Sequence, residues 1–236
     1  MSNDKSIKLY STYPHPCSYF RDREAKTLFV DPHIPFEGAL YTQLSRRGFR
    51  RSGRHVYRPD CQSCQQCIAT RIPVARFTPS RKQRRCQHRN ADLKVVVKQT
   101  MADNAYALYE RYIRVRHQDG DMFPPSREQF EQFLCDTIPS TRFACFYLQD
   151  TLIAVSVIDV MGDGLSAIYT FYDPDADYNR RSLGAMAILW MVEHCRELSL
   201  PYVYLGYWIR DCAKMRYKTD YRPLELFMSN RWIRLN

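Results

Sequence analysis

Three apolar runs joined by very short turns constrain the fold more than any other feature of the sequence. They read RFACFYLQ (142–149), LIAVSVIDVM (152–161) and LSAIYTFY (165–172). Runs of this kind, rich in β-branched and aromatic residues, are typical of strands, and the turns at Asp150-Thr151 and Gly162-Asp163-Gly164 join them as hairpins. Residues 182–198 then form a long run that is apolar nearly all round, which predicts a buried helix. The chain is therefore expected to build a sheet with a helix packed on it.

The flanking segments extend this pattern into an alternation of strands and helices. Residues 93–99 are predicted to be a strand, and helices are predicted to begin near Asn104 and Ser126. A strand, a helix and a last strand are predicted at residues 202–206, 211–218 and 223–229. This order predicts an α/β (α+β) domain at residues 91–236, a mixed sheet flanked by helices. The order resembles the N-acetyltransferase-like (GNAT) fold.

The loop before the long helix bears on the ligand that a GNAT-like domain would bind. In such folds this loop holds the phosphates of the donor. Residues 179–186 keep one arginine-to-glycine spacing of the usual coenzyme A pattern but lack its second small residue. A small-molecule N-acetyltransferase is therefore disfavoured.

Positive charge is concentrated in one part of the chain. Between Glu37 and Asp92 there are thirteen basic side chains and one acid, Asp60, so this stretch carries +12 against +10 for the whole chain. A localised basic surface is expected for a polyanionic partner such as nucleic acid. Residues 1–90 are also rich in Pro and Cys and poor in periodic runs, so a loop-rich, Cys/Arg-rich N-terminal lobe is predicted.

Cysteine content and hydropathy indicate the compartment. Nine cysteines without an export signal point to a reducing cytosol, where thiols are free, ligating or catalytic. No window approaches 18 uncharged apolar residues, so a membrane span is not expected. We therefore expect a cytoplasmic protein.

Four ordered motifs are distributed between residues 36 and 225, so they span most of the chain. They are FEGALYTQLSRRGFRRSG (36–53), YRPDCQSCQQC (57–67), YTFYDPDADYNRRSLG (169–184) and YLGYWIRDCAKMRYKTDYRPLE (204–225). These motifs resemble the aminoacyl-tRNA–protein transferases, a family of arginyltransferases and bacterial aspartate/glutamate leucyltransferases. The compact length and the CxxCxxC arrangement are most similar to the leucyltransferase branch. The resemblance implies transfer of leucine from leucyl-tRNA onto proteins with N-terminal Asp or Glu, which marks them for degradation. An arginyl-tRNA donor and a non-catalytic basic RNA-binding module remain the alternatives.

The basic residues suit such substrates, because the donor is a polyanion and the acceptor begins with a carboxylate. A planar guanidinium can donate two hydrogen bonds to a carboxylate or phosphate. Recognition of the acceptor carboxylate or the tRNA end is assigned to Arg46, Arg47, Arg50 and Arg51. Phosphate contacts with the tRNA are assigned to Arg81, Lys82, Arg84 and Arg85.

Reaction of an amine with an aminoacyl ester needs no cofactor, because the ester is already activated. The enzyme must aim the amine, accept its proton and stabilise the oxyanion. Tyr172 and Asp173 are the candidate proton acceptors. Tyr207 is a candidate for stacking on the unpaired bases of the tRNA. Neutralising the departing ribose oxygen or holding the terminal phosphate is assigned to Lys214, Arg216 and Lys218.

Three cysteines have the spacing of metal ligands. Cys61, Cys64 and Cys67 form one compact cluster, and Cys17 is available as a fourth thiolate. A zinc ion or an iron–sulfur cluster is one hypothesis for this group. Reduced thiols in a packed loop, or a redox sensor, are the others.

Overall fold

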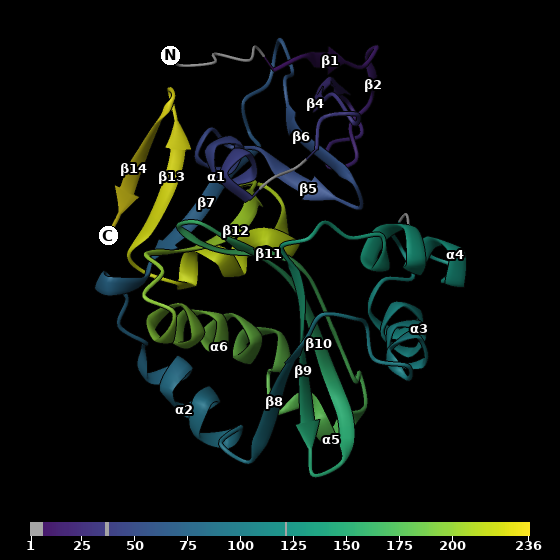
Figure 1. Cartoon of the computed structure of the whole chain (residues 1–236), viewed down its shortest axis with the longest axis vertical. Coiled ribbons are helices and arrows are strands. Elements are labelled where there is room, and N and C mark those ends of the chain that lie inside the picture. The colour runs from purple at the N-terminus through teal and green to yellow at the C-terminus, as the bar shows by residue number, and fades with distance from the viewer. Residues whose placement is uncertain (1–6, 36–37, 121) are drawn as a thin grey trace.

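The computed structural model describes residues 7–35, 38–120 and 122–236, so Phe36 and Glu37 of the first motif lie outside the described part. Over the described residues, an eight-stranded mixed sheet runs through the centre of the molecule in the order β14-β13-β7-β12-β11-β10-β9-β8 (Figure 1). Its strands are β7 (Ile68–Pro73), β8 (Leu93–Lys98), β9 (Thr141–Leu148), β10 (Thr151–Met161), β11 (Gly164–Tyr172), β12 (Tyr202–Trp208), β13 (Leu224–Met228) and β14 (Arg231–Leu235).

Helices cover both faces of this sheet. Successive side chains of β10 point to opposite faces of the sheet. Val157 packs in a cluster with Leu108, whereas Ile158 packs in a cluster with Leu189. The helices are α1 (Gly38–Arg46), α2 (Arg81–Arg89), α3 (Ala105–Arg116), α4 (Arg127–Phe130), α5 (Ala176–Asn179) and α6 (Leu183–Glu197). Helices α6 and α2 thus lie on one face, and α3 on the other. No helix in the described ranges is both long and apolar enough to cross a membrane.

The order of elements confirms the predicted α/β class and GNAT-like arrangement. Strands β9, β10 and β11 form an antiparallel meander, and β12 follows α6 and joins β11 in parallel. The parallel pairing covers only Gly164–Ser166 and Tyr202–Tyr204, so the two strands then part. Gly164 allows β11 and β12 to approach closely where their pairing begins, because a Cβ there would lie 2.3 Å from the Tyr202 carbonyl oxygen. We call the region where the strands diverge the β11/β12 split.

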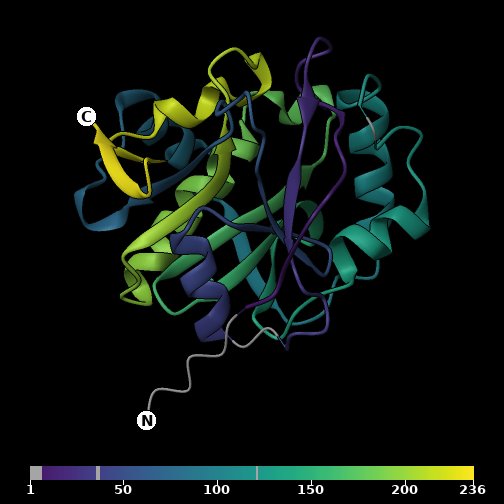
Figure 2. The same ribbon diagram turned by 90° about the horizontal axis from the view of Figure 1, so that it is seen from above.

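The N-terminal lobe forms a small sheet of its own, ordered β1-β4-β6-β5, and a two-stranded ribbon of β2 and β3. Its strands are β1 (Leu9–Ser11), β2 (His15–Pro16), β3 (Glu24–Ala25), β4 (Thr27–Val30), β5 (Arg50–Ser52) and β6 (His55–Pro59). The lobe lies at the top in Figure 1 and in front in Figure 2. Strand β7 leaves the lobe and pairs with both β12 and β13. The large sheet therefore includes a strand from before residue 90, and the division into domains at 1–90 and 91–236 stays a prediction.

Three 3-10 or π-helical segments complete the described part of the chain. They are the 3-10 helices η1 (Val74–Arg76) and η3 (Ala213–Asp220), and the π-helical turn η2 (Glu131–Cys135) that continues α4. The predicted helix at 211–218 is thus a 3-10 segment. It packs against β12, so its side chains approach the β11/β12 split.

A buried ion pair joins the lobe to the large sheet. Arg51 on β5 is 1% exposed, and its Nε and Nη2 each lie 2.7 Å from a carboxylate oxygen of Asp159 on β10. Its Nη1 donates to the Gly53 carbonyl at 2.6 Å, and its Nη2 donates to the Thr141 hydroxyl at 3.1 Å. The guanidinium is fully engaged, and β5 is held against β10.

Removing the acid of this pair should strongly destabilise the fold. Asp159→Ala leaves the Arg51 charge buried without its partner, and we expect a loss of about 3–5 kcal/mol in the free energy of unfolding. The matched control is Asp136→Ala, which breaks the exposed pair of Asp136 with Arg54. That change should cost about 0–1 kcal/mol. Urea unfolding measures both, and equal losses would contradict the anchoring role.

Candidate functional site

Arg50 lies in the β11/β12 split. Its Nη2 donates to the Ile168 carbonyl of β11 at 3.4 Å, and its guanidinium carbon lies 5.8 Å from the centroid of the Tyr207 ring. On β12, Gly206 has a φ of +72°, and a Cβ there would lie 2.8 Å from Arg50 Nη1. The backbone conformation therefore favours glycine at this position, and a side chain there would displace the guanidinium. The Arg50 Nε is buried and has no hydrogen-bond partner among the described residues.

A second cation reaches the same place from η3. Lys218 is 5% exposed, and its Nζ donates to the Tyr207 carbonyl oxygen. Within the described structure, neither Lys218 nor Arg50 forms an ion pair with an acid. Burial, together with the charge of Arg50, lowers the pKa of Lys218 to about 7. The split thus holds a guanidinium and an easily deprotonated amine.

Tyr207 connects this split with the lobe. Its hydroxyl lies 2.9 Å from the Gly48 carbonyl oxygen and 3.2 Å from the Tyr57 carbonyl oxygen, so its single hydrogen is shared between these two acceptors. Burial raises its pKa well above the ordinary value, so the phenol remains a neutral donor. The Tyr207 ring is largely buried in this structure. Its stacking on a tRNA base stays a prediction.

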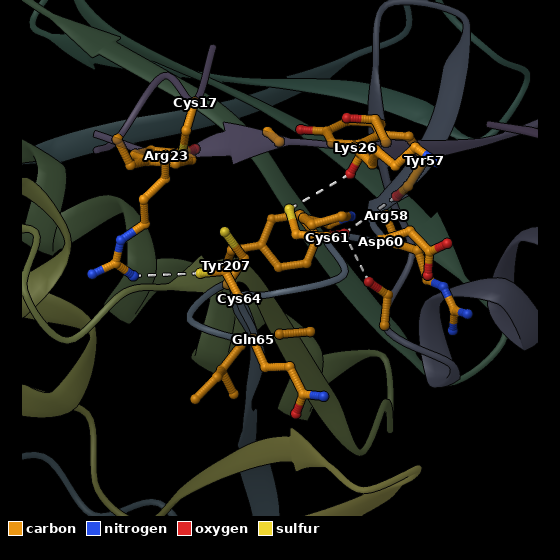
Figure 3. A pocket seen from close by; sticks show the side chains of 18 of the residues that line it. Cys17, Arg23, Lys26, Tyr57, Arg58, Asp60, Cys61, Cys64, Gln65 and Tyr207 are labelled. Carbon is orange, nitrogen blue, oxygen red and sulfur yellow. Dashed lines mark hydrogen bonds between the residues drawn. The ribbon is translucent and has the colours of Figure 1, made fainter. Parts of the chain in front are cut away.

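A cavity of about 520 Å³ lies beside Tyr207, between the lobe and the end of β13 (Figure 3). Its volume is within the range of small-ligand sites. Basic residues in the lining outnumber acidic ones. The basic residues are Arg23, Lys26, Arg47 and Arg58, and the acids are Glu24 and Asp60. The cavity therefore favours a ligand with negative charge.

The structure separates the four arginines of the first motif into two groups. Arg51 pairs with Asp159, and Arg46 Nε lies 2.6 Å from Asp163 Oδ2, so both hold the lobe to the sheet. Arg47 and Arg50 form no ion pair among the described residues and lie at the cavity and the split. Arg58 belongs to this second group, although the sequence did not single it out. The signal for Arg58 that the sequence offered was its position directly after Tyr57 in the second motif.

Three basic residues of the fourth motif were predicted to contact the ribose oxygen or the terminal phosphate. Of these three, Lys218 alone reaches the split in the described structure. Lys214 Nζ lies 2.8 Å from Asp119 at the surface. Arg216 is exposed, and its carbonyl accepts a hydrogen bond from Thr219. Irregular 3-10 geometry directs these neighbours apart.

Tyr172 and Asp173 lie at the far end of β11. Asp173 Oδ2 accepts a hydrogen bond from Arg111 Nη2 at 2.7 Å, and the Tyr172 ring lies 4.8 Å from that of Tyr112. Both contacts join β11 to α3. Their role as proton acceptors stays a prediction.

The basic residues assigned to tRNA lie together on α2. Ser80 and Gln83 form a capping box that starts this helix. The side chains of Arg81, Lys82, Arg84 and Arg85 are exposed, and none forms an ion pair in the described structure. Asn90 after α2 donates to the Arg181 carbonyl at 2.8 Å, which attaches α2 beside the start of α6.

Cys17, Cys61, Cys64 and Cys67 line the cavity (Figure 3), but they do not form the predicted ligand set. No group of three His, Cys, Asp or Glu side chains in the described ranges is arranged to hold a metal ion. The Cys61 thiol donates to the Lys26 carbonyl, and Arg23 donates to the Cys64 sulfur. Burial, together with the nearby Cys17, Cys61 and Cys64 thiols, raises the pKa of Cys67 to about 12. A zinc ion or an iron–sulfur cluster at these thiols therefore stays a prediction.

The unusual environment of Lys218 should make stability depend on pH. The folded protein releases the Lys218 proton near pH 7, whereas the unfolded chain keeps it to about the ordinary pKa of 10.5. The unfolded state then binds more protons, so stability rises with pH between these values, by up to about 1.4 kcal/mol per pH unit. Lys218→Met should lack this contribution. Urea unfolding from pH 7 to 10 measures the difference between the two proteins, and parallel curves would contradict it.

Comparison with known proteins shows the family of this chain. The family described as arginine-tRNA-protein transferase matches twice, its N terminus at residues 15–85 and its C terminus at residues 104–228. Proteins named aspartate/glutamate leucyltransferase are 54% identical in Pseudomonas aeruginosa, over 97% of both chains, and 53% identical in Stutzerimonas stutzeri, over 100% of both. Among solved structures, L-PGS from Bacillus licheniformis has a TM-score of 0.45 at 12% identity, covering 61% of this chain and 46% of that one. Because the family matches cover most of the chain and the relatives are aligned over nearly its whole length, the chain belongs to the arginine-tRNA-protein transferase family, as its motifs predicted.

Proposed function

We propose that this chain transfers leucine from leucyl-tRNA to the N-terminal Asp or Glu of an acceptor protein in the cytoplasm. The leucyltransferase names of relatives that share more than half of its residues support the activity. The observation that carries the proposal is the cationic β11/β12 split, which lies between a basic helix and a basic cavity. An arginine side chain from an alternative donor would meet like charges there. The product, with its new N-terminal leucine, is marked for degradation.

The chemistry needs charge stabilisation more than a covalent intermediate. The acceptor amine attacks the ester carbonyl carbon, and a carbon–nitrogen bond forms while negative charge develops on the carbonyl oxygen. The bond to the ribose oxygen then breaks, that oxygen gains a proton and the amine nitrogen loses one. Fixed positive groups beside a developing oxyanion are a strong source of catalysis in a site that excludes water. Arg50 fits this role, because its guanidinium stays charged and has no acidic partner in the described structure, and Lys218 adds positive charge while it is protonated.

The donor tRNA is placed by α2. Its four exposed basic side chains lie on a helix attached beside the start of α6. Phosphate contacts supply most of the affinity for nucleic acid and position it without reading its sequence. The tRNA end would then approach the β11/β12 split past α6.

Transfer itself is tested with a peptide that begins with Asp. Incubation with leucyl-tRNA should add the mass of one leucine residue at the N-terminus. The same peptide beginning with Asn should remain unchanged, because it lacks the carboxylate. A gain of arginine from arginyl-tRNA would favour the alternative donor. No gain from either tRNA, with binding retained, would favour a non-catalytic RNA-binding protein.

Neutralising α2 tests the site of tRNA binding. The triple variant Arg81→Gln, Arg84→Gln, Arg85→Gln should bind tRNA more weakly, and the slope of log K against log salt should fall by about 0.7–0.9 per lost contact. The matched control is Arg54→Gln, Arg114→Gln, Arg127→Gln, which removes three exposed arginines that pair with acids. Filter binding at several salt concentrations measures both slopes. Equal slopes in the two variants would place the tRNA elsewhere.

A further inference from the structure

The proposed roles of α2 and of the β11/β12 split leave the cavity in the lobe without a ligand. The cavity is lined by the loop of residues 61–67, by β6 and by the end of β13. It reaches Tyr207, whose carbonyl oxygen accepts the hydrogen bond from Lys218 in the split. The basic helix α2, in contrast, packs with α6 on the opposite face of the sheet. The cavity is therefore separate from the expected path of the tRNA and adjacent to the place of reaction.

Arg58 is the polar feature of this cavity that the fold does not explain. Its Nε is buried and has no hydrogen-bond partner among the described residues. Its guanidinium carbon lies 5.1 Å from the centroid of the Phe49 ring, which supports one side of the group. No acid in the described ranges pairs with it, and the same is true of Arg47 in the same lining. A buried donor without a partner costs stability, so its retention points to a ligand.

We infer that this cavity binds the first residues of the acceptor polypeptide, and that Arg58, with Arg47, holds the side-chain carboxylate of the N-terminal Asp or Glu. The inference rests on the proposed leucine transfer and assigns the acceptor to a place within it. A guanidinium suits a carboxylate because it donates two parallel hydrogen bonds. An acceptor that begins with Asn or Gln would leave the cation unpaired, so we expect it to bind more weakly.

Tyr207 connects this subsite with the split. It lines the cavity together with Arg58, and the guanidinium carbon of Arg50 lies 5.8 Å from its ring centroid on the side of the split. The ring centroids of Tyr57 and Tyr207 lie 6.3 Å apart, and both residues line the cavity with Arg58 (Figure 3). The α-amine of an amino acid is only a few bonds from its side-chain carboxylate. Binding of that carboxylate at Arg58 therefore directs the amine towards the split.

Steady-state kinetics of Arg58 variants tests the assignment. Arg58→Gln should raise the KM for peptides beginning with Asp or Glu by about 10- to 100-fold, the range for a lost hydrogen bond to a charged group, and leave the KM for leucyl-tRNA unchanged. Arg58→Lys should recover part of the loss, because it restores charge without the bidentate geometry. The matched control, Arg54→Gln, changes another lobe arginine that pairs with Asp136 and should behave as wild type. An unchanged peptide KM in Arg58→Gln would overturn the inference.

Native cysteines provide a second measurement on the unaltered protein. Cys17 and Cys64 line the cavity and are partly exposed, whereas Cys135 is partly exposed outside it. A saturating Asp-peptide should slow alkylation of Cys17 and Cys64 by N-ethylmaleimide and leave Cys135 unaffected. Protection by uncharged tRNA, and not by the peptide, would mean that the tRNA end occupies the cavity and would overturn the inference. If the wild type fails to transfer leucine but the peptide still protects these thiols, the proposed function fails and the acceptor subsite stands.

Discussion

The buried pair of Arg51 with Asp159 sets the geometry on which the site depends. It joins β5 of the lobe to β10 of the large sheet, with both side chains at most 1% exposed. Successive residues of a strand point in opposite directions. Once Arg51 is held by Asp159, the neighbouring Arg50 is directed away from that pair and into the β11/β12 split. The lobe is thus attached by one arginine and contributes the next one to the site.

Paired and unpaired cations have different consequences in this molecule. Arg46 and Arg51 meet carboxylates, and each contact holds the lobe on the sheet. Arg50, Arg58 and Lys218 have no acidic partner in the described structure. Buried cations without partners reduce stability, and they are expected where a ligand supplies the missing charge. Burial and the nearby charge of Arg50 lower the pKa of Lys218 to about 7, since no carboxylate in the described part of the chain offsets them.

Much of the GNAT-like core was predictable from local patterns. The hairpin strands β9 to β11 and helix α6 follow from apolar runs and turn residues, whose signals lie within a few positions of each other. Strand β7 was not predicted, because IATRIP is short and its partners β12 and β13 lie far along the chain, as in the contact of Thr70 with Gly206, 136 residues later. The segment around Lys218 was predicted as a helix, whereas contacts with β12 and the 3-10 geometry decide its course.

The sequence by itself determined the fold class, the family and the concentration of positive charge, because these depend on periodicity, motif order and composition. It did not determine which arginines are free to bind substrate. Arg50 and Arg51 are adjacent and chemically identical, yet one is neutralised by Asp159 and the other is not. The cysteines showed a similar limit, since ligand spacing in the sequence did not by itself produce a group arranged to hold a metal ion in the described structure. Only the tertiary structure decides such roles, because the charge available at a site depends on partners that the fold brings from distant parts of the chain.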